Sequence, residues 1–128
     1  MIVNRKSFTV ILLELNKPNK NGRIYRKESF NPPVEGKEIL GYLGQTEIWQ
    51  QHIDRAAFMV KNIHFEDDKL IGDIHPLSTP MGDLLQQVLK HVTYRTMGYA
   101  KTMQVDEHTE ITDIHLVGII ALPHEQAA

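Results

Sequence analysis

Residues 57–92, AFMVKNIHFEDDKLIGDIHPLSTPMGDLLQQVLKHV, decide the fold, because two strand patterns and one helix pattern follow each other there. Residues 57–65 form one well-marked strand pattern, with side chains that alternate between two faces, and residues 70–77 form a second strand that returns beside it. An acidic turn lies between them, so the strands are expected to form a hairpin. The alternation places Phe58, Val60 and Asn62 on one face of the first strand, and Met59, Lys61 and Ile63 on the other.

The helix is predicted over about residues 80–92. Thr79 precedes it as a cap, Pro80 takes the first helical position, and Asp83 lies near the positive end of the helix dipole. Apolar residues at helical spacing predict one buried stripe, formed by Leu84, Leu85, Val88, Leu89 and Val92.

Strand patterns continue on both sides of this stretch. Runs rich in apolar and β-branched residues predict further strands at 8–15, 23–25, 39–43, 93–101, 103–105 and 110–122. Asn21-Gly22 predicts a tight turn, and Gly98 a bulge. The pattern as a whole predicts one α+β domain over residues 1–128, in which an antiparallel sheet or partly closed barrel packs against one main helix.

Length, charge and composition narrow the function classes. The chain has 128 residues and no cysteine, which excludes disulfides, thiolate metal sites and a cysteine nucleophile. Its formal charge of −2 argues against a nucleic-acid partner. No apolar run approaches the ~20 residues that cross a bilayer, and the first residues do not resemble a signal peptide. We therefore expect no membrane association, and action inside the cell that makes the protein or in a particle assembled there.

Three segments before the predicted helix carry further motifs. NKPNKNGRIY at residues 16–25 matches the pattern N-x-N-G-R-I-Y, and GYLGQT at 41–46 takes the place of G-E-L-D/G-H-P. The hairpin at 60–72 matches the form V…L…E-D/G-x-L-x-G.

Three more motifs follow in the same order. LSTPMG at 77–82 matches L-x-T-P-x-G, TYRTMG at 93–98 stands where S-S-R-G-x-G is expected, and IHLV at 114–117 resembles I-D-L-V. Taken in order, these segments resemble the prohead core (head maturation) proteases of tailed phages, over nearly the whole chain. The resemblance implies a serine-protease fold related to herpesvirus assemblin.

The resemblance also implies that the chemical positions have changed. The family's His in G-x-H-P falls on Gln45, and its Ser in S-S-R-G falls on Thr93, with Tyr94 beside it. A second His falls near Phe58, and the Asp of I-D-L-V is His115. A serine-type hydroxyl needs an adjacent base, which neither an amide nor a phenyl ring supplies. Loss of a triad member costs ~10⁴–10⁶ in rate, so we expect no catalytic residues.

An alternative is an active protease with a shifted nucleophile. Either Thr93 or Ser78 would attack, with His52, His75 or His115 as the base. Asp73, His75 and Ser78 do fall within six residues of each other. Triads, however, depend on tertiary geometry and not on local clustering, so we interpret Ser78 as part of the lead-in to the helix cap.

The seven histidines raise the question of a metal site. Three imidazoles on neighbouring strands hold zinc in some enzymes, and His64, His75 and His115 are the candidates. Their spacing shows no H-x-H or H-x-x-x-H motif. We therefore expect neither a metal nor another cofactor.

The candidate binding residues lie in loops and next to the altered positions. Trp49 stands in a polar stretch and suits an interface, although it suits core packing equally well. Asn21, Gly22 and Arg23 form a turn that either holds an anion or simply connects two strands. Arg95 occupies the family's arginine position, where it either shapes an oxyanion site or makes a structural bond.

These features predict a phage head protein that uses an inactivated protease fold for binding. It would sit in the virion as a capsid-associated or decoration-type protein, after assembly in the host cytoplasm. The expected partner is the major capsid protein or another head component, and a homo-oligomer is possible. The remaining alternatives are the active head-maturation protease and a free module that regulates an active protease or binds a host factor.

Overall fold

The computed structural model describes residues 7–19, 21–44 and 55–123. Its strands are β1 (Phe8–Glu14), β2 (Arg23–Tyr25), β3 (Ile39–Leu43), β4 (Ala56–Glu66), β5 (Lys69–Pro76), β6 (Val92–Val105) and β7 (His108–Pro123). The helices are α1 (Pro80–Val88) and the short 3-10 helices η1 (Lys27–Ser29) and η3 (Leu89–His91). Within this part of the chain, no helix has the length and apolar character needed to span a membrane.

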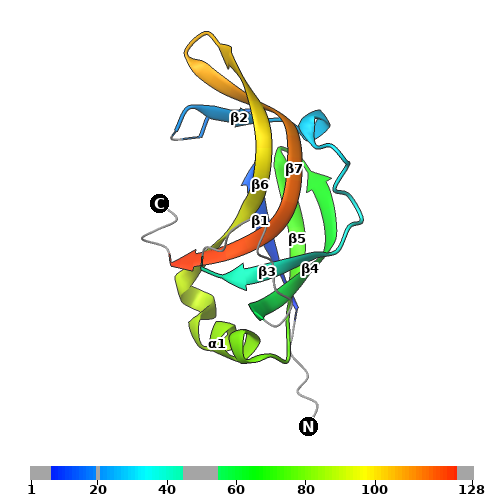
Figure 1. Cartoon of the computed structure of the whole chain (residues 1–128), viewed down its shortest axis with the longest axis vertical. Coiled ribbons are helices and arrows are strands. Elements are labelled where there is room, and N and C mark those ends of the chain that lie inside the picture. The colour runs from blue at the N-terminus through cyan, green and yellow to red at the C-terminus, as the bar shows by residue number, and fades with distance from the viewer. Residues whose placement is uncertain (1–6, 20, 45–54, 124–128) are drawn as a thin grey trace.

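The seven strands form one strongly curled sheet, open along one side like half a barrel (Figure 1). Their order is β1-β5-β4-β3-β7-β2, and β6 pairs with β7 as well. The hairpins β4–β5 and β6–β7 are antiparallel, whereas β2 and β3 pair with β7 in parallel. The predicted strand-dominated fold is confirmed, but the sheet is mixed. A tight turn imposes antiparallel pairing only on consecutive strands, and long connections separate β7 from β2 and β3.

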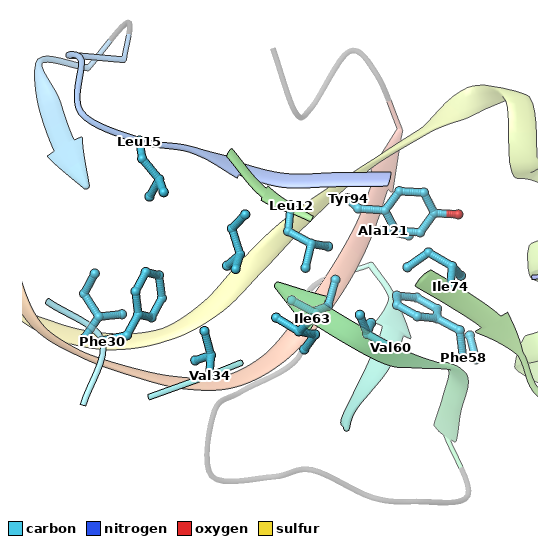
Figure 2. Packing of buried hydrophobic residues seen from close by; sticks show 14 of the residues in the cluster. Leu12, Leu15, Phe30, Val34, Phe58, Val60, Ile63, Ile74, Tyr94 and Ala121 are labelled. Atoms are coloured by element: carbon cyan, nitrogen blue, oxygen red, sulfur yellow. The ribbon is translucent and has the colours of Figure 1, made fainter. Parts of the chain in front are cut away.

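The main core lies inside the curl. Leu12 from β1, Val60 from β4 and Ile74 from β5 point toward each other there (Figure 2). Helix α1 packs against β4 and β5, with Leu85 fully buried. Burial of these side chains supplies most of the free energy that holds the curl together.

A second, smaller cluster lies on the other face of the sheet, with residues from β3, β4, β6 and β7. It consists of Tyr42, Ala56, Met97, Ile120 and Leu122. Residues alternate between the two faces of a strand, so Ile119 joins the main core while Ile120 joins this cluster. Part of the sheet is therefore covered on both faces.

Two side chains do not lie on the faces that the sequence pattern predicts. Asn62 is exposed with φ 53°, because the β4–β5 register shifts between Lys61 and His64 and turns Ile63 inward instead. Leu84 is 44% exposed, whereas Leu85 next to it is 0% exposed. The part of the helix surface that contacts the sheet is therefore narrower than the apolar stripe in its sequence, and Leu84 lies outside the contact.

The strands predicted separately at 93–101 and 103–105 form one strand, β6. Three other local predictions are confirmed. Thr79 caps α1, because its Oγ1 accepts a hydrogen bond from the Gly82 N–H at 3.0 Å. The helical region predicted over 80–92 ends at His91, with its last turn in the 3-10 form. The register shift between Met97 and Gly98 is the predicted bulge.

Candidate functional site

One of the altered positions, Phe58, lies in the core beside Tyr94, which follows Thr93 in the chain. The Phe58 ring packs edge-on against the Tyr94 ring, with centroids 5.5 Å apart and an interplanar angle of 88°. Tyr94 also contacts Phe8 of β1, at 6.0 Å between centroids. At Phe58, where the resemblance implies a histidine, the chain has a ring that belongs to a cluster of three aromatic side chains.

The Phe58 ring fills its site completely. A Cβ atom added to Gly41, the opposite residue in β3, would lie within the volume of the ring, 1.9 Å from its nearest carbon. Phe58 is fully buried, and Figure 2 shows its ring pointing into the core next to Ile74. The side chain therefore packs between strands and does not face solvent.

The Tyr94 hydroxyl is not a catalytic base in this environment. It is buried and has no hydrogen-bond partner among the described residues. Burial raises the pKa of Tyr94 to about 12, since the phenolate would be poorly solvated. The phenol is therefore neutral near pH 7.

Thr93 lies at the edge of the sheet where β3 ends. It pairs with Leu122 of β7 and is half-buried. On the other side of β7, the Gly44 N–H donates to the Ala121 carbonyl at 2.9 Å. The start of β6 and the end of β3 are thus separated only by β7. Gln45, Trp49 and His52 lie outside the described residues.

His115 lies far from Thr93 along the sheet. It pairs with Tyr99, seven positions along β7 from the partner of Thr93, which corresponds to about 20 Å. Its ring stacks on Tyr99 with centroids 5.0 Å apart, and its Nε2 is 3.5 Å from Asp113. The structure therefore does not bring His115 and Thr93 together.

Asp113 is the acidic centre of this outer cluster. Its pKa is lowered, first by the hydrogen bond that Asn31 donates at 3.1 Å and then by the nearby His115 and Lys101. The carboxylate is therefore charged at neutral pH and pairs with its neighbours. The arrangement is an exposed polar cluster on the outside of the β6–β7 hairpin.

Ser78 does not complete a triad with its sequence neighbours. The Asp73 carboxylate accepts hydrogen bonds from Thr9 at 2.8 Å and Asn62 at 3.3 Å, which direct it to β1 and β4. Ser78 is exposed in the bend before α1, as expected for a residue that leads into the helix cap.

The three candidate zinc ligands do not gather. Over the described ranges, no group of three or more His, Asp or Glu side chains is placed to hold a metal ion. His64 instead binds the Asn62 carbonyl at 2.7 Å and Glu66 at 3.3 Å. The pKa of His64 is raised, most of all by the contact with the Asn62 carbonyl and then by the contact with Glu66.

Three of the predicted binding residues, Asn21, Arg23 and Arg95, line two adjoining grooves along β6. One groove, of about 290 Å³, lies between β1 and the start of β6, and Asn21, Thr93 and Arg95 are among its lining residues. The other, of about 260 Å³, continues along β6 and is lined by Arg23, Thr96 and Thr102, among others. Tyr25 lines both grooves, so they meet at β2.

The turn on the groove wall is held by its own side chain. The Asn19 carboxamide oxygen accepts the N–H groups of Asn21 and Arg23, at 2.9 and 3.0 Å. Gly22 has φ +73°, which suits glycine. These hydrogen bonds tie Asn21 and Arg23 to Asn19, and Arg23 lines the second groove.

Sequence reasoning missed two residues of this site. Tyr25 was predicted only as part of a short strand, and Ile11, 47% exposed at the groove, as part of a buried one. Ile11 lies on the same face of β1 as the exposed Thr9, ahead of the register shift between Ile11 and Leu13. An uninterrupted apolar run does not show which of its residues face outward.

Comparison with known proteins identifies the fold. No protein-family model matches the chain, and no curated protein does. Among solved structures, the chain is similar to the bacteriophage T4 capsid assembly protease, gp21, with a TM-score of 0.75 and 18% sequence identity. The match covers 91% of this chain and 80% of that one. The predicted prohead-protease-like fold is thereby confirmed, and at this identity the likeness concerns the fold alone.

Proposed function

We propose that this chain is a structural protein of a phage head, in which an inactivated protease fold binds the major capsid protein or another head component. The observation that carries the proposal is the buried contact between Phe58 and Tyr94. In a fold shared with a capsid assembly protease, Phe58 stands where the resemblance implies a histidine, and Tyr94 adjoins Thr93, which stands where it implies the serine. A site filled with aromatic rings has no proton acceptor.

The grooves along β6 supply a binding surface in place of a catalytic one. The first groove runs between β1 and β6, each of which is paired on one edge only within the described part of the sheet. An extended segment of a partner fits such a place, since unpaired strand edges offer hydrogen bonds to a polypeptide backbone. Arg23 and Arg95, both exposed, favour a segment that carries acidic side chains.

Binding is tested with the capsid and scaffold proteins of the same phage. Co-sedimentation of the chain with assembled capsids is expected to weaken about tenfold in the double variant Arg23→Ala, Arg95→Ala, because two charge-assisted contacts are lost. Lys61→Ala, an exposed cation on β4, is the matched control and should bind as the wild type does. Absence of the protein from purified virions would favour the free regulatory module instead.

The active protease is the second candidate, and one observation favours it. Thr93 is half-buried at the sheet edge where β3 ends, in a fold shared with a protease. Incubation with capsid and scaffold proteins decides between the two. We expect intact substrates, whereas cleavage that disappears in Thr93→Ala or Ser78→Ala would replace our proposal with the protease.

A further inference from the structure

The end of the β6–β7 hairpin is the most exposed part of the sheet. Every residue from Gly98 to Glu107 is exposed, and Figure 1 shows the end of the hairpin projecting beyond β2 and the rest of the molecule. Large apolar side chains are exposed here as well, namely Tyr99 (56%), Met103 (52%) and Val105 (38%). We refer to residues 101–107 as the arm.

The arm has a regular strand with one free edge. Residues 101–105 pair with 108–112 of β7 without a break in register, and β6 has no other partner strand in the described sheet. Every second N–H and C=O of this strand therefore points away from the sheet. Proline, bulges or several charges usually protect such an edge, and between residues 101 and 105 only Lys101 does so.

We propose that this free edge pairs antiparallel with the same edge of a second copy, about a two-fold axis at Met103. This register uses the whole regular segment, and opposite residues share a face of the new sheet. Met103 then lies opposite Met103 of the second copy, Thr102 lies opposite Gln104, and Lys101 lies opposite Val105. Met103 therefore meets an apolar side chain, Val105 meets the aliphatic part of Lys101, and the polar Thr102 meets the polar Gln104.

The order of charges along the arm selects a second copy as the occupant. Lys101 stands at the base, and Asp106 and Glu107 stand at the tip. Antiparallel pairing of two identical arms brings the cation of each next to the acidic tip of the other. Two such contacts form by symmetry, since a two-fold interface is self-complementary.

The size of the contact sets the strength of the dimer. Five residue pairs bury less than the ~1,200 Å² found at the lower end of stable complexes. We therefore expect a weak dimer that forms as the protein concentration rises. In a virion, copies held next to each other would pair more readily than free ones do.

Charge exchange at Met103 tests the proposal. Sedimentation velocity from about 10 to about 500 µM is expected to show the wild type moving from monomer to dimer. Met103→Glu and Met103→Lys each place like charges opposite each other on the axis, which should raise the dissociation constant about tenfold or more. An equal mixture of the two variants should restore the dimer, because the opposed charges then attract. Leu84→Glu, at an exposed apolar residue of α1, is the control and should dimerise as the wild type does.

The outcomes separate clearly. The proposal is overturned if the wild type stays monomeric over the whole concentration range. It is also overturned if Met103→Glu and Met103→Lys each dimerise as strongly as the wild type does. Two monomeric variants whose mixture does not associate exclude the two-fold register. Circular dichroism of each variant verifies folding, which we expect to be retained because the Met103 side chain is half exposed. Capsid binding is measured separately, so failure here leaves the proposed function untouched.

Discussion

At the scale of single residues, two buried tyrosines stand out. The hydroxyls of Tyr42 and Tyr94 are both buried and lack hydrogen-bond partners in the described part of the structure. A buried hydroxyl without a partner loses its bonds to water and gains none in return. Burial raises the pKa of both phenols, in agreement with this environment.

Removal of the Tyr94 hydroxyl should therefore not destabilise the protein. We expect Tyr94→Phe to leave the free energy of unfolding unchanged or to raise it by about 1 kcal/mol, since the desolvation penalty disappears while the ring contacts remain. Urea titration followed by circular dichroism measures the change. Tyr94→Ala is the comparison, with an expected loss of about 3–5 kcal/mol from the cavity. A clear loss in Tyr94→Phe would mean that the hydroxyl has a partner.

His64 makes stability depend on pH near neutrality. Its folded-state pKa is raised, so the folded state binds the proton more tightly than the unfolded state does. The resulting stabilisation is complete below the unfolded pKa of about 6.5 and is lost as the pH rises through the folded pKa. Wild type and His64→Gln should differ more in unfolding free energy at pH 5.5 than at pH 8. A constant difference between the two pH values would contradict this account.

At the scale of elements, α1 depends on a glycine. A Cβ atom on Gly82 would lie 1.9 Å from the Leu77 carbonyl oxygen and 3.0 Å from that of Ala57. Both are backbone atoms that cannot turn aside. The close approach of the helix to the end of β5 therefore requires glycine at this position.

This packing reverses the usual effect of alanine in a helix. Gly82→Ala should destabilise the protein by about 1–3 kcal/mol through overpacking, although alanine is the better helix former. Gln86→Ala, at an exposed position of the same helix, is the control and should be neutral within about 0.5 kcal/mol. Thermal unfolding of the two variants gives the comparison. A stabilised Gly82→Ala would show that the helix can move away from the sheet.

At the scale of the whole molecule, one core joins nearly every element. Residues from β1, β4, β5, β6, β7 and α1 belong to the same buried cluster. Next to the groove between β1 and β6, the two strands contact each other through the rings of Phe8 and Tyr94. Removal of one element would thus expose the core that the others share, and we propose that the chain is a single domain.

A single domain of this size should unfold in one step. We expect thermal unfolding followed by far-ultraviolet circular dichroism to coincide with calorimetry, with equal calorimetric and van't Hoff enthalpies. Two separated transitions would indicate independent units and would contradict the single-domain proposal. The measurement should be made at about 10 µM, below the range in which we expect the arms to pair.

The amino-acid sequence alone determined the features that depend on neighbours in the chain. The β4–β5 hairpin, the helix with its Thr79 cap and the Gly98 bulge all follow from local patterns. Alternation, capping chemistry and turn residues act over a few positions, so they can be interpreted without the fold. The prohead-protease-like fold was also predicted, from six short motifs in the correct order.

Features that depend on contacts between distant residues became apparent only in the folded molecule. The parallel pairing of β2 and β3 with β7, the outward turn of Asn62, and the exposure of Leu84 all arise from register and packing between elements. The same is true of the site. The fold places Arg23 and Arg95 in adjoining grooves along β6, and it separates His115 from Thr93. Spacing in a sequence does not contain these distances, because the curvature of a sheet results from the packing of all its strands together.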